Sequence, residues 1–320
     1  MLTIYNNNSK LLDINSKPTT LTYYANLYYQ TIVSGSSPAT EKAKKNDISK
    51  FLSFFIEYTG NDHVDNWTPS TSRYFLKELL NKGFKPNTIN RALDSLKHFA
   101  KWLDNHRPLL AGYPFIGIKN IYEDPPHWNG LSSKQVMRLK MACEQRLKAC
   151  SRRNQNPLME ITIFLTLLNT GLRESELVSL NIQQYYARGF HNVRRKGSNV
   201  TKKIPLPDEA KQYLDRYLLT QKQKNDHDPI FNIKGKRIST RAVRYVCERI
   251  SDYASSNLAI EEKIHLSPHM LRHTFLKKIA DKHGVHIAQK MSGNVSISEI
   301  FRYTKPSQDE IDQIAEELNP

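Results

Sequence analysis

The segment HLSPHMLRHTF, residues 265–275, combines side chains that can move protons with one that can hold an anion. Ser267 followed by Pro268 is typical of a helix start, because the hydroxyl can accept from free N–H groups and proline fixes φ at the first helical position. On such a helix His269 and Arg272 lie three residues apart and therefore side by side. Histidine titrates near neutral pH and arginine is a permanent planar cation, so the pair could act on a phosphate.

Two alternatives explain the same segment without a phosphate. It could be the solvated basic face of an ordinary helix. In addition, His265, His269 and His273 repeat at every fourth residue, a spacing that could place metal ligands together. No cysteine or carboxylate ligand accompanies them, so a zinc site is the less favoured of the two alternatives.

A second candidate group lies in the segment PLMEITIFLTLLNTGLRESELVSLNI, residues 157–182. Its apolar first part predicts a buried helix that breaks at Thr170 and Gly171, and a second, short helix then carries Arg173 and Glu176. Backbone on both sides holds an arginine at such a turn, so its guanidinium can be aimed at a ligand. Taken alone, Arg173 fits better as a surface arginine paired with a nearby carboxylate.

Two further segments carry single candidate side chains. The sequence FHNVRRKGSNVTKKIPLP, residues 190–207, predicts two strands around the turn KGSN, with Lys196 at the tip of the hairpin. The sequence KMSGNVSISEIFRYTKPSQDEID, residues 290–312, places Tyr303 on a short helix that ends at Pro306. Taken alone, the lysine fits a solvated turn and the tyrosine fits a packed amphipathic side chain.

The charge of the chain favours a polyanionic partner. Its 320 residues have a formal net charge of +16, and the pI is about 9.6. Residues 129–320 hold 32 Lys and Arg against 20 Asp and Glu, whereas the closing segment, residues 307–320, is acidic. No apolar run approaches the roughly 18 residues that a membrane helix needs, so we expect nucleic acid and no membrane as the partner.

The cysteines and the N-terminus bear on the cellular compartment. Cys143, Cys150 and Cys247 are odd in number and contain no C-x-x-C pair, so neither a disulfide frame nor a zinc site is predicted. The opening MLTIYNNNSKLLDINSK lacks the apolar core of an export signal. We therefore expect a reduced, cytoplasmic protein, and the expected nucleic-acid partner would make it nucleoid-associated.

Stepwise changes in composition divide the chain into regions. Residues 1–18, rich in Asn and Ser, predict a flexible N-terminal arm, and residues 19–105 follow helical periodicity. Residues 106–128 hold four prolines and two glycines without a helical period, which predicts a linker. A second domain is expected over residues 129–306, followed by the acidic tail over 307–320.

Basic side chains gather on two predicted helices of the first domain. The helix over 85–105 buries one apolar stripe and presents basic residues on its opposite side, and the helix over 40–59 has a basic start. These side chains could lie on DNA, although an ordinary solubilising face explains them equally well. The candidates for DNA contact are Lys42, Lys44, Lys45, Arg91, His98 and Lys101.

Together, these segments resemble the tyrosine recombinase (phage integrase) family in their order and context. The matching motifs are TGLRESEL, the strand pair ending in IPL, SPHMLRHTF and SISEIFRYTKPS, and the resemblance spans residues 19–306. It implies a mainly α fold with a small antiparallel β-sheet or hairpin. A helical core-binding domain and a mixed α+β catalytic domain would form a C-shaped DNA clamp.

The resemblance also implies a role for each candidate side chain. Tyr303 would attack a DNA phosphodiester, giving a 3′-phosphotyrosine and a free 5′-hydroxyl. Arg173 and Arg272 would hold the phosphate oxygens as charge develops on them. His269 would assist proton transfer at the tyrosine, and Lys196 would protonate the leaving oxygen. Because the arginines supply positive charge, neither a metal nor another cofactor is expected.

Three further positions, Glu176, His273 and Asn294, are expected to belong to the site around these catalytic residues. Glu176 matches an acidic position of the family and is expected to buttress Arg173, and His273 is expected to support the site next to Arg272. Nine residues before the tyrosine the family usually has Gly-His or Gly-Trp, whereas this chain has Gly293 and Asn294. Asparagine can donate a hydrogen bond to a phosphate oxygen but does not titrate, which leaves a catalytically impaired DNA-binding accessory protein as the alternative function.

The regions present resemble the minimal two-domain plan of Xer-, Cre- and transposon-resolvase-like recombinases. This resemblance implies that the partner is a double-stranded DNA recombination site and that four protomers assemble on two DNA duplexes as a homotetramer. The reaction would serve integration, excision or resolution of a mobile element. The core-binding domain argues against a type IB topoisomerase. In the tail, Ile311, Ile314 and Leu318 follow helical spacing, which predicts either a contact with a neighbouring protomer or a self-packed helix.

Overall fold

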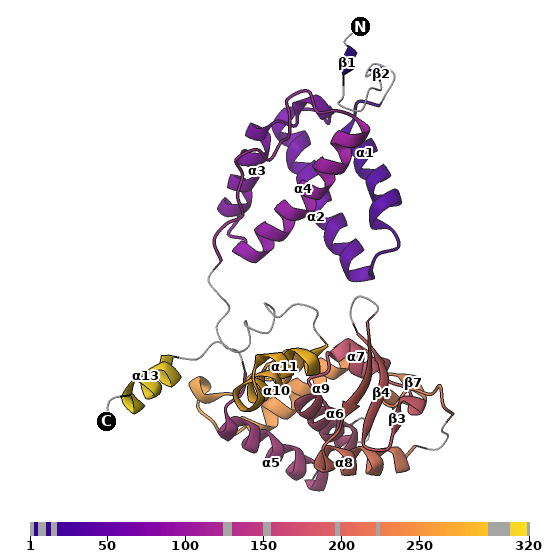
Figure 1. The fold of residues 1–320 in the computed structure, drawn as a ribbon, viewed down its shortest axis with the longest axis vertical. Coiled ribbons are helices and arrows are strands. Elements are labelled where there is room, and N and C mark those ends of the chain that lie inside the picture. The colour runs from indigo at the N-terminus through magenta and orange to yellow at the C-terminus, as the bar shows by residue number, and fades with distance from the viewer. Residues whose placement is uncertain are drawn as a thin grey trace. The chain divides into compact units, whose positions relative to one another are not determined.

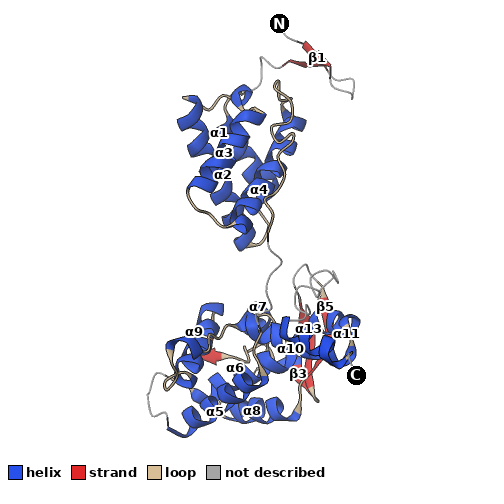
Figure 2. Ribbon diagram, turned by 90° about the vertical axis from the view of Figure 1, so that its left-hand side faces the viewer, coloured by secondary structure: helices blue, strands red, loops and turns tan. Residues whose placement is uncertain are grey.

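The computed structural model describes residues 3–5, 11–13, 18–123, 130–149, 155–195, 199–221, 225–293 and 308–318. The chain forms two compact units, Met1–Asp124 and Pro125–Pro320. Helices dominate both, and every strand pair that the structure describes is antiparallel (Figures 1 and 2). This confirms the predicted fold class, mainly α with a small antiparallel sheet.

The first unit is a bundle of helices around an aromatic core. Its main helices are α1 (Leu21–Tyr28), α2 (Pro38–Thr59), α3 (Pro69–Asn81) and α4 (Pro86–His106), and the strands β1 (Thr3–Tyr5) and β2 (Leu11–Asp13) pair ahead of them. The apolar stripe expected over 85–105 is buried on α4, and the ring of Trp67 contacts Phe99 of this stripe and Phe51 of α2 at tilted angles. Periodic burial of one face therefore explains why this region is helical.

The segment 107–123, which falls in the predicted linker, packs on the first unit. Leu109, Phe115 and Ile118 are buried in its core. The Asn90 side chain on α4 receives the Ile121 N–H at 2.8 Å and donates to the Ile121 carbonyl at 2.9 Å. Prolines and glycines exclude a helix here, but three of the apolar side chains between them still join the core. Residues 124–129 lie outside the described part of the chain.

The second unit surrounds one apolar helix. Its helices are α5 (Ser133–Ala149), α6 (Pro157–Thr170), α7 (Glu174–Ser179), α8 (Asp208–Leu219), α9 (Thr240–Ala254), α10 (Pro268–His283), α11 (Val285–Ser292) and α13 (Gln308–Glu317). Its strands are β3 (Tyr185–Tyr186), β4 (Gly189–Arg194), β5 (Val200–Pro205), β6 (Asn232–Ile233) and β7 (Lys236–Arg237). α6 is buried along nearly its whole length, and α5, α8, α9 and α10 pack against it. None of the helices in the described part of the chain is long and apolar enough to cross a membrane.

Candidate active site

The turn between α6 and α7 positions Arg173. α6 ends at Thr170, and Gly171 then adopts a left-handed conformation with φ of 61°. A Cβ atom at position 171 would overlap the Phe275 ring on α10, so the close approach of α6 and α10 requires glycine here. Arg173 follows as the N-cap of α7.

Glu176 holds Arg173 from within the same helical turn. The Arg173 backbone N–H donates to Glu176 Oε2 at 2.8 Å, and Arg173 Nη1 donates to Glu176 Oε1 at 2.9 Å. The Glu176 side chain is only 4% exposed, whereas that of Arg173 is 27% exposed. The structure therefore places the carboxylate behind Arg173 and leaves part of the guanidinium at the surface.

Arg272 ties the ends of two helices together from the middle of α10. α10 begins at Pro268, where Ser267 Oγ accepts from the Met270 N–H, and it ends before Gly284, as the sequence predicts. Arg272 is 1% exposed, and its guanidinium donates to the carbonyls of Gly171 and Ser292. These bonds use two of the five N–H groups of a guanidinium and fix its plane between α6 and α11.

His269 and His273 lie one helical turn apart on α10. The rings of His269 and His273 meet edge to face with centroids 4.3 Å apart. His269 is exposed at the surface of α10, but partial desolvation of its ring, followed by the charges of Arg272 and Arg173, lowers its pKa below the usual value. Burial, with smaller contributions from His269 and Arg272, lowers the pKa of His273 to about 4. Both shifts favour the neutral imidazole, which is the form that can accept a proton.

The alternative metal site is not assembled. His265 precedes α10 and is exposed, so it does not share a helix face with His269 and His273. Among the described residues, no group of three His, Cys, Asp or Glu side chains is placed to hold a metal ion.

Arg195 is a buried member of this region that the sequence analysis missed. It follows β4, and its Nη1 donates to Glu176 Oε2 at 2.6 Å, whereas the Arg173 side chain donates to Oε1. A signal for its burial does exist in the sequence, since side chains alternate along a strand and Val193, two residues earlier, is a core residue. The family resemblance assigns a role to Lys196, the next residue, and none to Arg195.

A cleft lies beside these groups on the second unit. Its volume is about 430 Å³, and arginine, hydroxyl and amide side chains dominate its lining. The lining residues are Arg173, Ser175, Glu176, Ser179, Gln184, Arg194 and Arg195. Because Arg173 and Arg195 neutralise the only carboxylate of this lining, the cleft suits an anion.

The other predicted site residues fall into two groups. Lys196, Asn294 and Tyr303 lie outside the described residues. The DNA-contact candidates lie on α2 and α4 of the first unit, where Lys42, Lys45, Arg91, His98 and Lys101 are exposed and Lys44 is half-buried over the Tyr28 ring. Arg91 also forms an ion pair with the buried Asp47 at 2.8 Å, so its guanidinium helps to join α2 and α4.

Comparison with known proteins identifies the family. Residues 130–310 match the phage integrase family, and residues 25–106 match the phage integrase N-terminal SAM-like domain. The tyrosine recombinase XerC of Thermodesulfovibrio yellowstonii is 26% identical and aligns over 84% of this chain and 86% of its own. The tyrosine recombinase XerD of Oceanobacillus iheyensis is 25% identical over 92% of this chain and 96% of its own.

Solved structures agree on the fold. The Tn1549 transposon integrase in complex with circular intermediate DNA has a TM-score of 0.69 at 19% identity, covering 95% of this chain and 100% of that chain. A lambda integrase dimer bound to a COC′ core site has a TM-score of 0.69 at 14% identity, covering 91% and 97%. With more than half of its length matched by the family, the chain belongs to the phage integrase family of tyrosine recombinases, enzymes that cleave and rejoin DNA.

Proposed function

We propose that this protein is a site-specific recombinase that cleaves and rejoins DNA through a 3′-phosphotyrosyl intermediate. The observation that carries the proposal is the grouping of Arg173, His269 and Arg272 where α6, α7 and α10 meet. Both guanidiniums act on the pKa of His269, and Arg272 bonds to the turn that leads into Arg173. Two cations beside a neutral base are what a phosphoryl transfer requires.

The reaction follows from the charges. Tyr303 Oη attacks the phosphorus and loses its proton with the help of His269, while the 5′-oxygen leaves with a proton from Lys196. Arg173 and Arg272 stabilise the charge that grows on the nonbridging oxygens. The new tyrosyl ester replaces the broken phosphodiester, so the strand can be rejoined without ATP or a resident cofactor.

The biological setting is part of the same proposal. The relatives named XerC and XerD, and the transposon and lambda integrases that share the fold, support a protein that acts at a double-stranded recombination site. We place it at the nucleoid, as a homotetramer on two duplexes, serving integration, excision or resolution of a mobile element.

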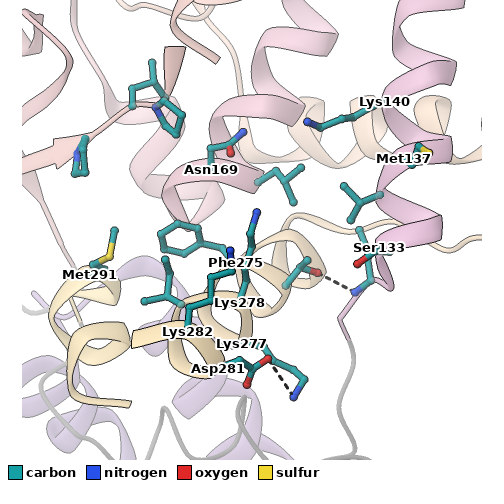
Figure 3. Close-up of a pocket in the computed structure, with 18 of the residues that line it drawn as sticks. Ser133, Met137, Lys140, Asn169, Phe275, Lys277, Lys278, Asp281, Lys282 and Met291 are labelled. Atoms are coloured by element: carbon teal, nitrogen blue, oxygen red, sulfur yellow. Dashed lines mark hydrogen bonds and ion pairs between the residues drawn. The ribbon is translucent and has the colours of Figure 1, made fainter. Parts of the chain in front are cut away.

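The acidic tail is proposed to contact a neighbouring protomer. Ile311 and Ile314 on α13, and Leu318 directly after it, are exposed, and α13 contains no basic residue. On the second unit a groove of about 1240 Å³ runs between α5 and α10, with apolar side chains such as Met137 and Phe275 inside it (Figure 3). Basic side chains outnumber carboxylates in its lining, which includes Lys140, Arg188, Lys277, Lys278 and Lys282 against Asp208 and Asp281. An acidic amphipathic helix complements this groove in both polarity and charge.

Covalent trapping tests the proposed function. DNA flanking the gene is first footprinted to find the bound site, and a duplex of that site with a nick next to the cleavage position is then incubated with the protein. A covalent protein–DNA band is expected for the parent and is expected to vanish for Tyr303→Phe, whose DNA affinity should be nearly unchanged. Binding without any covalent band in the parent would favour the accessory protein that Asn294 raises as an alternative.

A further inference from the structure

We propose that Arg195 is a positioning residue for strand cleavage, which acts on Arg173 through the carboxylate that the two arginines share. The inference rests on the proposed recombinase function and assigns a role that the sequence motifs did not indicate. Arg195 does not reach the surface, because its side chain is 1% exposed. It is therefore suited to hold other groups in place rather than to bind DNA itself.

The shared carboxylate couples the two arginines. Glu176 Oε1 accepts from Arg173 Nη1 at 2.9 Å, while Glu176 Oε2 accepts from Arg195 Nη1 at 2.6 Å. Oε2 also accepts from the Arg173 backbone N–H at 2.8 Å. Since Glu176 is itself buried, neither oxygen can exchange an arginine for water without a large desolvation cost. A shift of Arg195 must therefore move Glu176 and, with it, Arg173.

Arg195 also touches two other segments of the second unit. Its Nε donates to Thr201 Oγ1 on β5 at 3.0 Å, and its Nη2 donates to the Met291 carbonyl at the end of α11 at 3.4 Å. Gly293, which caps α11 with φ of 67°, lies against it, since a Cβ there would come within 2.8 Å of Arg195 Nε. One guanidinium thus joins the β4–β5 pair, α7 and the end of α11.

These three segments are the ones that carry candidate groups. Arg195 immediately precedes Lys196 in the chain, Glu176 supports Arg173, and Gly293 immediately precedes Asn294. Arg272 holds the Ser292 carbonyl, next to the Met291 carbonyl that Arg195 holds. A lysine in place of Arg195 would keep the charge but not the planar fork, so it could not serve Glu176, Thr201 and Met291 together.

A double-mutant cycle tests whether Arg195 acts through Arg173. Single-turnover cleavage of the nicked duplex is measured for the parent, Arg195→Lys, Arg173→Lys and the double variant. We expect Arg195→Lys to slow cleavage by about 10-fold or more at unchanged DNA affinity. If it acts through Arg173, the double variant should be no more than about threefold slower than the slower single variant, because the same contribution cannot be lost twice.

A buried arginine away from the site gives the matched control. Arg146 on α5 is also buried, and its Nη2 lies 2.5 Å from Glu160 Oε2 on α6. Arg146→Lys likewise replaces a buried, carboxylate-bound guanidinium by an ammonium group. Its effect on cleavage, if any, should multiply with that of Arg173→Lys. If the effects of Arg195→Lys and Arg173→Lys on the cleavage rate also multiply, Arg195 has only a structural role and the inference is wrong.

A second variant covers the possibility that Arg195→Lys does not fold. Thr201→Val keeps the shape of the side chain and removes only the Oγ1 that accepts from Arg195 Nε. Its effect on the cleavage rate should be smaller than that of Arg195→Lys and should likewise not multiply with the effect of Arg173→Lys. If the parent forms no covalent complex on its footprinted site, the proposed function fails. If the parent cleaves and both Arg195→Lys and Thr201→Val multiply with Arg173→Lys, only the role of Arg195 fails.

Discussion

Single side chains around the candidate site differ in exposure, and this difference separates their tasks. Arg195 and Glu176 are buried and face other protein groups, whereas Arg173 keeps a quarter of its side chain at the surface. Glu176 could be assigned behind Arg173 from the sequence because it matches an acidic position of the family's motif, as TGLRESEL shows. Arg195 could not, since its partner Glu176 is 19 residues away and only the folded strand brings them together.

Lys196 is predicted to act as the acid that protonates the leaving 5′-oxygen. Lys196→Ala should slow cleavage of ordinary nicked DNA by about 100-fold or more. A substrate with sulfur in place of the 5′-bridging oxygen should restore the rate to near that of the parent, because a thiolate leaves without a proton. Single-turnover cleavage of both substrates measures this. An equal defect on the sulfur substrate would assign the acid to another residue, such as Lys202.

His273 is predicted to make the second unit sensitive to acid. Its pKa is about 4 in the folded chain against 6.5 ordinarily, so between these values the unfolded chain binds a proton that the folded chain does not. The free energy of unfolding should therefore fall as the pH drops through this window. His273→Gln should reduce the slope by about one proton. Urea unfolding across the window measures the slope, and an unchanged slope would contradict the prediction.

At the scale of helices and strands, local patterns were informative and long-range packing was not. The start of α10 at Pro268 and its stop before Gly284 follow from capping residues, which act within one turn. The strands β4 and β5 appear on either side of the predicted KGSN turn. The packing of Leu109, Phe115 and Ile118 into the first unit could not be predicted from the sequence, because it depends on a surface that α4 and its neighbours create.

Gly171→Ala tests the junction of α6 and α10. The new methyl group would need a left-handed backbone and would overlap the Phe275 ring, so we expect a loss of about 2–4 kcal/mol in the free energy of unfolding. Gly235→Ala is the matched control: its φ is 77°, but a Cβ there meets nothing within 4 Å, and it should cost only about 1–2 kcal/mol. Equal losses in urea unfolding would show that crowding against Phe275 does not matter.

At the scale of the whole molecule, the chain consists of two units with separate cores. The net charge of +16 and the order of the motifs were sufficient to predict a DNA-acting member of this family, because both are properties of the printed sequence. They could not locate the groove between α5 and α10, which exists only once these helices pack.

The proposed tail contact predicts a defect in assembly rather than in binding. Ile314→Asp places a charge on the apolar face of α13 and should lower the yield of complexes that hold two duplexes by about 10-fold, while binding of one duplex stays normal. Ile260→Asp is the matched control, since Ile260 is also an exposed isoleucine of the second unit. Native gels with one and two labelled duplexes measure both. Normal two-duplex complexes with Ile314→Asp would exclude this contact.

The packing of residues 107–123 on α4 decides where the first unit can be cut. A fragment that stops at residue 105 would lack Leu109, Phe115 and Ile118 and would present an apolar surface to water where they belong. It would also leave the Asn90 amide without the backbone of Ile121. Such a fragment should aggregate or be digested readily by proteases, whereas a fragment that continues to residue 123 should not aggregate and should resist digestion.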